Sequence, residues 1–274
     1  MVTPMARRQV VGFVQDGFGV SQRRACETIG TARSTVRYAS QRGPDPLRDP
    51  LRALALARPC YGYRRLGVLL RRAGWRVNDK RVYRLYRLDG LAVRRKRRKR
   101  LAAGMHRPLP VPTRPHLRWS MDFTTDTLAT GRPFRTLNLV DDGSRECPLI
   151  VVDHGISGER ITRELDQLAE TRPLPDTIVV DNGPEFTSRA LDRWAYERGV
   201  ALHFIRPGKP VDNAFIESFN GKFRDECLNE EVFLDLLDAR TKIEAYRVDY
   251  NTVRPHSALG NRTPTEYATE RLAE

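Results

Sequence analysis

The 274-residue sequence contains no run of about 18 or more apolar residues, so it has no segment of membrane-spanning length. Its first residues, Met1-Val-Thr-Pro-Met-Ala-Arg-Arg, are not followed by the apolar core of a secretory signal. The four cysteines are widely separated and form no CxxC pair, which argues against a zinc site or a disulfide framework. We therefore expect a cytoplasmic protein with free thiols and no membrane partner.

Acidic residues are scarce in the first part of the chain. Residues 1–118 contain 6 Asp and Glu against 29 Lys and Arg, a net charge of +23. Residues 119–274 contain 28 acidic and 19 basic residues, a net of −9, so that the whole chain carries +14. A solubilising charge excess would not be confined to one half. The division predicts a module that binds a polyanion, with DNA or RNA as the first candidates, joined to a different domain.

The basic part reads as two helical units. In residues 1–43, Ser21 is placed as an N-cap and Gly30 as a helix end, which favours a helix-turn-helix with exposed Arg33 and Arg37. A plain helical hairpin would give a similar pattern. Residues 44–91 form a second unit of the same kind, in which leucine stripes at helical spacing predict core positions. These stripes are Leu66, Leu69 and Leu70, then Val82, Leu85 and Leu88. Arg64 and Arg65 flank the first stripe and are candidate DNA contacts.

A linker covers residues 92–118. It begins with an uninterrupted run of seven cations, which includes Arg94, Arg95, Lys96, Arg97 and Arg98. Such a run predicts phosphate contact without sequence preference. A proline-rich stretch follows, which indicates a semi-rigid connection and a domain boundary near residue 118.

The hydrophobic pattern changes at Trp119. Strands are expected at 119–128, 134–140, 148–152, 177–180 and 201–204, and helices at 158–170, 185–198, 213–228 and 233–250. Three strands in a meander, followed by helix, strand, helix, strand and helix, indicate an α/β domain over residues 119–250. This order matches a ribonuclease-H-like fold, a mixed five-stranded sheet with flanking helices, and leaves 251–274 as a C-terminal tail.

Three acidic residues have informative positions on these elements. Asp122 lies inside the first strand, Asp181 directly follows the apolar strand Ile178-Val-Val180, and Glu217 lies on a helix. A carboxylate in an apolar strand is costly to bury unless it is paired or binds metal. Such a cluster suits phosphodiester chemistry, because carboxylates hold Mg²⁺ or Mn²⁺, two ions per site, about 4 Å apart. Taken singly, Asp181 could be a turn residue and Glu217 a surface residue.

The spacing adds specificity, since thirty-five residues separate Asp181 from Glu217 and Arg224 follows seven positions later. With Trp119-Ser-Met-Asp-Phe-Thr, Asp181-Asn-Gly-Pro-Glu-Phe and Tyr250-Asn-Thr-Val-Arg-Pro-His256, the chain resembles the integrase-core family. The resemblance is to bacterial insertion-sequence transposases of the second-reading-frame (OrfB) type and to retroviral integrases. It implies that Asp122, Asp181 and Glu217 are the catalytic metal ligands, the DDE motif.

The helix around Glu217 has a polar face and a buried face. The polar face carries Asn213, Glu217, Asn220 and Arg224, and the buried face carries Ile216, Phe219, Phe223 and Cys227. We expect Arg224 and Asn213 to lie along the DNA path, with Arg224 on a phosphate near the cut. Lys209 and Lys222 are further candidates for phosphate contact, although exposed lysines without a specific role would look the same.

For the other titratable groups, the argument for a catalytic role is weaker. Asp126, Asp141 and Asp142 could be accessory ligands, but turn or surface roles are expected. Glu185 is assigned to a first helical turn, and His256 to a structural tail rather than to a general base.

The resemblance implies cleavage at insertion-sequence ends followed by 3′-hydroxyl strand transfer into target DNA. It also implies binding of terminal inverted repeats, a homo-oligomer assembled on DNA, nucleoid association, and an upstream-frame (OrfA-type) helical partner or fusion. Two alternatives remain: a metal-dependent nuclease that does not join, and an inactive DNA-binding regulator.

Overall fold

The computed structural model describes residues 3–38, 45–93, 110–206 and 213–273. It divides into two compact units, Met1–Asp49 and Pro50–Glu274. Each unit is described by itself. None of the described helices is long and apolar enough to cross a membrane.

The first unit contains three helices, α1 (Pro4–Phe18), α2 (Gln22–Ile29) and α3 (Arg33–Arg37). The predicted cap at Ser21 is confirmed, because its hydroxyl accepts a hydrogen bond from the Arg24 amide at 3.3 Å. Gly30 ends α2 in the left-handed region, at φ 66°, where glycine carries no side-chain penalty. The small core is formed by Val11, Ala25 and Cys26.

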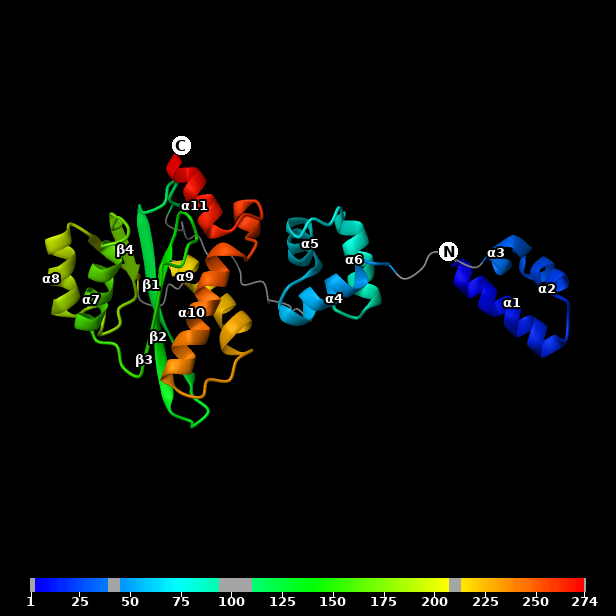
Figure 1. The fold of residues 1–274 in the computed structure, drawn as a ribbon, viewed down its shortest axis with the longest axis horizontal. Coiled ribbons are helices and arrows are strands. Elements are labelled where there is room, and N and C mark those ends of the chain that lie inside the picture. Colours follow the sequence, from blue (N-terminus) through cyan, green and yellow to red (C-terminus); the bar gives the residue numbers. More distant parts are fainter. Residues whose placement is uncertain (1–2, 39–44, 94–109, 207–212, 274) are drawn as a thin grey trace. The chain divides into compact units, whose positions relative to one another are not determined.

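The second unit begins with α4 (Arg48–Ala57), α5 (Tyr63–Arg72) and α6 (Asp79–Leu88) (Figure 1). Asn78 caps α6, since its side chain accepts from the Arg81 amide at 2.8 Å. The leucine stripe on α5 is buried as predicted, and so are Val82 and Leu85. Leu88 was wrongly assigned to the core. It is 69% exposed, because the last turn of α6 buries Leu85 and Tyr86 and leaves Leu88 on the open side.

The rest of the second unit is built on a five-stranded sheet, and its predicted mixed topology is confirmed. The strands are β1 (Arg118–Thr127), β2 (Pro133–Asp141), β3 (Leu149–Asp153), β4 (Thr177–Val180) and β5 (Ala201–Phe204). Their spatial order is β3-β2-β1-β4-β5. The first three are antiparallel, while β4 pairs parallel to both β1 and β5. β1 therefore lies at the centre of the sheet.

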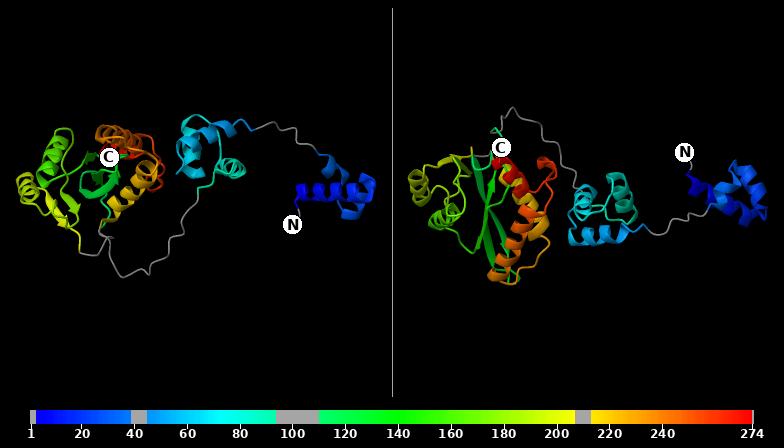
Figure 2. Two further views of the ribbon diagram at one scale, coloured as in Figure 1. Left: turned by 90° about the horizontal axis from the view of Figure 1, so that it is seen from below. Right: turned by 45° about the horizontal axis from the view of Figure 1, so that its top comes forward.

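Helices cover both faces of this sheet (Figures 1 and 2). α7 (Gly158–Ala169) and α8 (Arg189–Arg198) lie on one face, where Trp119, Met121 and Ile178 join their apolar side chains. α9 (Ala214–Phe223) and α10 (Leu236–Thr252) lie on the other and pack on Phe134, Val140 and Val152. The predicted buried face of α9 is confirmed, with Ile216 and Phe223 fully inaccessible. β1 thus runs between two hydrophobic layers.

Several boundaries differ from the expectation. The helix predicted over 213–228 changes at Arg224 to a π-helical turn, η2 (Arg224–Leu228). α8 begins at Arg189 with Ser188 as its cap, so Glu185 lies in the preceding turn and its assignment to a first helical turn was wrong. The segment predicted as a tail contains a short 3₁₀ turn, η3 (Ser257–Leu259), and a helix, α11 (Pro264–Ala273), that contacts α10.

Candidate active site on β1, β4 and α9

Asp122 lies midway along β1, and its carboxylate is held from two sides. One oxygen accepts a hydrogen bond from the Phe123 amide at 2.8 Å, and the other accepts from the Asn220 amide group of α9 at 2.8 Å. Burial and the negative charges of Asp181 and Glu217 outweigh those two hydrogen bonds and raise the pKa of Asp122 to about 6. Asp122 therefore stands in the electrostatic field of the other two predicted acids.

Asp181 follows β4, the parallel neighbour of β1. Ser120 is paired with Val179, two residues before Asp122 and Asp181 respectively, and the charge of Asp181 acts on Asp122. The chain turns sharply after it, because one Asp181 carboxylate oxygen accepts from the Gly183 amide at 2.8 Å. A Cβ atom on Gly183 would lie 2.9 Å from that oxygen, so only glycine lets the turn approach so closely. The carboxyl end of a parallel strand is where α/β folds place ligand sites.

Glu217 is exposed on the first turns of α9, and partial burial raises its pKa. Within the described part of the chain, no hydrogen bond or ion pair holds its carboxylate. Both of its carboxylate oxygens are thus open to a ligand.

The polar face of α9 lies along β1. Asn213 donates to the Met121 carbonyl at 3.4 Å, Asn220 binds Asp122, and Arg224 donates to the Thr125 carbonyl at 3.1 Å. Each contact reaches a residue of β1 within three positions of Asp122. The helical spacing that placed these side chains on one face is borne out by these contacts.

Asn138 on β2 is a positioning residue that the sequence analysis missed. Its amide group donates to Asn220 at 2.8 Å and to Thr124 at 3.0 Å. Asn220 in turn donates to Asp122, so a chain of amides runs from β2 through α9 to the acid. The signal was a polar residue between Leu137 and Leu139, because an amide buried among apolar side chains is costly unless it is hydrogen-bonded.

The donor set fits a divalent cation, since it offers only carboxylate oxygens and its like charges raise the pKa of Asp122. As they stand, however, no three His, Cys, Asp or Glu side chains among the described residues are grouped closely enough to hold a metal ion. Three carboxylates repel one another without a cation between them, and the residues just before α9, 207–212, lie outside the description.

The remaining acids serve the fold. Asp141 accepts hydrogen bonds from the His116, Gly143 and Ser144 amides and from the Trp119 indole. Asp142 accepts from Ser120 at 2.8 Å and pairs with Arg118 at 2.6 Å. Both are buried, as turn-forming residues rather than ligands.

Three further titratable side chains are held by contacts that serve the fold. Asp126 accepts from the Thr127 amide at 2.7 Å, and Glu185 pairs with Arg135. His256 is buried, and burial beside Arg254 lowers its pKa to about 2, so it stays neutral in the tail, as expected.

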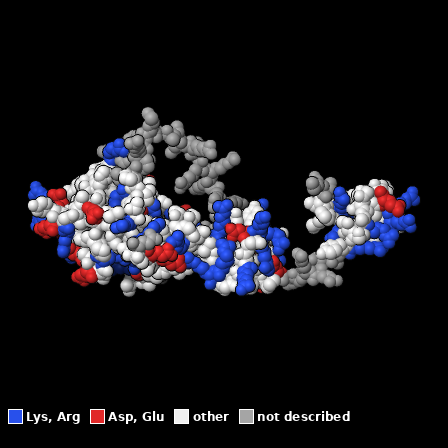
Figure 3. All heavy atoms as spheres, turned by 90° about the horizontal axis from the view of Figure 1, so that it is seen from above, with Lys and Arg blue, Asp and Glu red and all other residues white. Residues whose placement is uncertain are grey.

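The candidate DNA contacts fall into three groups. Arg33, Arg37, Arg64 and Arg224 are exposed, and Lys and Arg gather over α1–α3 and over α4–α6 in Figure 3. Arg65 is half-buried and bound to Glu226 at 3.2 Å, and Lys222 is half-buried beside α5 and the core. Lys209 and the run containing Arg94, Arg95, Lys96, Arg97 and Arg98 lie outside the described residues.

The family models agree with this architecture. An HTH-like domain matches residues 45–99, and two integrase core domain models match residues 112–210 and 198–264. Among solved structures, the catalytic core domain of HTLV-2 integrase aligns with 59% of this chain and 99% of its own, at 19% identity and a TM-score of 0.46. The fold is that of an integrase core.

Relatives extend the likeness over the whole chain. The uncharacterized 31.7 kDa protein of insertion element IS407 from Burkholderia multivorans is 48% identical over 264 residues, 95% of each chain. The transposase of insertion sequence element IS904 from Lactococcus lactis is 29% identical over 76% of this chain and 87% of its own. The chain belongs to the integrase-core family of bacterial insertion-sequence transposases, of the second-reading-frame (OrfB) type. It is accordingly an enzyme of the polynucleotidyl transferase class that acts in DNA transposition.

Proposed function

We propose that this chain cuts DNA at the ends of its insertion sequence and joins the resulting 3′-hydroxyl ends to target DNA, with Asp122, Asp181 and Glu217 as metal ligands. The observation that carries the proposal is that the charges of Asp181 and Glu217 both act on Asp122 of β1. Asp181 directly follows β4, the parallel neighbour of β1, and the Glu217 helix is held along β1 by hydrogen bonds. Two divalent ions held by these carboxylates would activate the attacking oxygen and stabilise the leaving one.

The two reactions use the same bond chemistry. In cleavage, a water oxygen bonds to phosphorus and the bond to the 3′-oxygen of the element's end breaks, which leaves a 3′-hydroxyl. In strand transfer, that 3′-oxygen attacks a target phosphodiester in line, and the target's own 3′-oxygen leaves. Asn220 and Asn138 keep Asp122 oriented through both steps. Arg224, exposed beside β1, binds a phosphate near the cut.

The parts outside the core bind DNA. We assign residues 1–43 and 44–91 to two helical units that recognise the terminal inverted repeats, 92–118 to a basic linker, 119–250 to the catalytic core and 251–274 to a C-terminal segment. Arg33, Arg37 and Arg64 are free to contact phosphates because their side chains are exposed. Joining two ends requires a homo-oligomer on DNA, and an upstream-frame partner would add further binding.

The test is joining of labelled DNA ends in Mg²⁺ or Mn²⁺ by the wild-type chain and by Glu217→Gln. We expect joining to disappear in the variant while DNA binding persists. Glu197→Gln is the matched control, because Glu197 is an exposed glutamate on α8, across the sheet from α9. Metal-dependent hydrolysis without joining would favour a nuclease. DNA binding without metal-dependent chemistry in any form of the protein would favour a regulator.

A further inference from the structure

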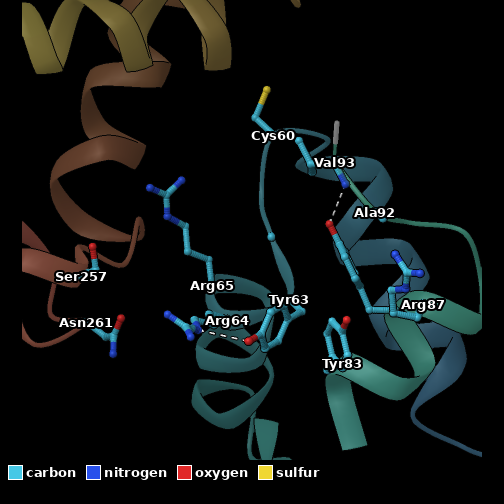
Figure 4. Close-up of a pocket in the computed structure, with 12 residues that line it drawn as sticks. Cys60, Tyr63, Arg64, Arg65, Tyr83, Arg87, Ala92, Val93, Ser257 and Asn261 are labelled. Atoms are coloured by element: carbon cyan, nitrogen blue, oxygen red, sulfur yellow. Dashed lines mark hydrogen bonds between the residues drawn. The ribbon is translucent and has the colours of Figure 1, made fainter. Parts of the chain in front are cut away.

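A cavity of about 290 Å³ lies beside α9, on a different side of the helix from the acids. Four cations line it: Arg65, Arg145, Lys222 and Arg254. None of its lining residues is acidic. Phe215 and Tyr250 form apolar walls, and Ser218 and Ser257 add hydroxyl groups. Figure 4 draws a neighbouring pocket that shares Arg65 and Ser257 with this cavity, and it shows Arg65 extending from α5 toward the segment of the core that carries Ser257.

Two of the four cations are balanced by one carboxylate. Arg254 binds both oxygens of Glu226 at 2.6 Å, and Arg65 binds the same group at 3.2 Å. Glu226 does not line the cavity, and its negative charge is paired with these two arginines.

Lys222 and Arg145 have no carboxylate within ion-pair distance in the described part of the chain. The Lys222 ammonium donates to the Ser218 hydroxyl at 3.1 Å. Arg145 stacks its guanidinium 3.7 Å from the centre of the Phe215 ring, and one of its terminal nitrogens is buried without a hydrogen-bond partner. The nearest acids already have partners. Asp141 accepts from the Gly143 and Ser144 backbone amides, and Asp142 pairs with Arg118.

This crowding of like charges is costly. Burial and the neighbouring charges of Arg254, Arg65 and Arg145 outweigh the opposite effect of Glu226 and lower the pKa of Lys222 to about 8. Burial also lowers the pKa of Arg145. A buried cation without a partner destabilises the fold unless an anion neutralises it. The site is therefore prepared for a ligand of negative charge.

The position of the cavity on α9 identifies the anion. Ala214, Phe215, Ser218 and Lys222 share one side of the helix, and Glu217 lies on the adjoining side. A helix with its side chains is about 10–12 Å across, and each strand of B-DNA carries a phosphate about every 3.4 Å of rise. A strand bound at Glu217 can therefore reach the cavity within a few nucleotides.

We propose that the cavity formed by Arg145, Lys222, Arg254 and Arg65 binds a backbone phosphate of the DNA, a few nucleotides from the bond that is cut. This inference rests on the proposed function, since it takes the strand bound at Glu217 as its ligand. Guanidinium forks and an ammonium group are the usual partners of phosphate oxygens, and the stacked, pre-positioned Arg145 loses little entropy on binding.

The test measures DNA binding separately from cutting. In a Glu217→Gln background, the affinity for a duplex carrying the element's end is measured by fluorescence anisotropy as a function of salt, with and without Lys222→Gln. Arg193→Gln is the matched control, because Arg193 is an exposed arginine on α8 and its loss changes the net charge equally. We expect Lys222→Gln to reduce the slope of log K against log salt by about 0.9 relative to that control, since one phosphate contact is lost.

A second measurement guards against a folding defect. Because Lys222 is repelled by its neighbours, Lys222→Gln should leave the melting temperature of the DNA-free protein equal or higher while weakening DNA binding. A lysine with a structural role would lower both. Arg145→Gln, tested with the same two measurements, should also weaken DNA binding.

Three results would overturn the proposal. The first is a salt slope for Lys222→Gln equal to that of Arg193→Gln. The second is protection of the wild-type protein by inorganic phosphate, lost in Lys222→Gln, with DNA binding unchanged, which would assign the cavity to a free anion. The third is an absence of DNA binding by the Glu217→Gln protein in which the Lys222 variant is made. A wild-type chain that binds DNA with the expected slope but fails to join ends would instead contradict the proposed function and leave the phosphate site standing.

Discussion

The Asp122 carboxylate is oriented by a pair of asparagines as well as by the Phe123 amide. Asn220 donates to the carboxylate, and Asn138 donates to Asn220, so the rotamer of the acid is fixed before any ligand arrives. Such outer contacts orient metal ligands and raise their affinity for the ion. The amide pair also compensates part of the repulsion that Asp122 feels from the other two acids.

Replacing Asn220 should therefore weaken catalysis without abolishing it. We expect Asn220→Ala to lower the rate of end joining by about 10- to 100-fold and to raise the Mg²⁺ concentration needed for half-maximal rate. Metal titrations of the joining rate measure both. Asn229→Ala, at an exposed asparagine beyond η2, is the control and should behave as the wild type. An unchanged Mg²⁺ requirement in Asn220→Ala would contradict the positioning role.

At the scale of single elements, the sequence predicted strands better than helix ends. β4 and β5 have the predicted bounds, because short apolar runs between polar residues leave little choice. The change from α9 to the π turn η2 was not predicted, since the apolar spacing continues through Cys227 as it would in an α-helix. In the structure, Glu226 in this turn meets Arg254, twenty-eight residues away, and such a partner leaves no local signal.

The candidate site was likewise only partly predictable from the sequence. The acids and Arg224 could be found because their spacing follows a family pattern. Asn138 and Arg145 act through partners on α9 that are close only in the folded chain. No periodicity marks them.

The junction of α7 and α8 depends on a glycine. A Cβ atom on Gly158, at the start of α7, would lie 1.9 Å from the Ser188 hydroxyl oxygen, which caps α8. Gly158→Ala should lower the free energy of unfolding by about 1–3 kcal/mol, because it displaces the cap or the helix. Urea denaturation of the variant measures the loss. Gly155→Ala is the control, since a Cβ there meets no atom within 4 Å, and equal midpoints for the two variants would refute the argument.

At the scale of the whole second unit, charge pairs connect segments far apart in the chain. Arg58 of the region after α4 binds Asp249 of α10 at 2.6 Å, and Arg72 of α5 binds Glu266 of α11 at 2.7 Å. The pair of Arg254 and Glu226 is the most buried of these, with the arginine side chain only 1% exposed. Buried pairs of this kind are costly to break, whereas exposed pairs contribute little.

We expect Glu226→Gln to destabilise the protein by about 3–5 kcal/mol, because it leaves Arg254 buried without a counter-charge beside Lys222 and Arg65. Chemical denaturation of the full chain gives the value. Glu270→Gln breaks an exposed pair with Arg262 and should change stability by less than about 0.5 kcal/mol. Similar losses in the two variants would show that burial does not govern the strength of these pairs.

The order of the three acids along the chain has a consequence during synthesis. The helices α1–α6 and the strand that carries Asp122 leave the ribosome first, and Asp181 follows. Glu217 and the asparagine that orients Asp122 are both on α9, which is made only after all five strands. A nascent or prematurely terminated chain can therefore hold its helical DNA-binding segments without a complete set of carboxylates. If these carboxylates hold the metal ions as proposed, the chain can cut DNA only after translation has passed α9.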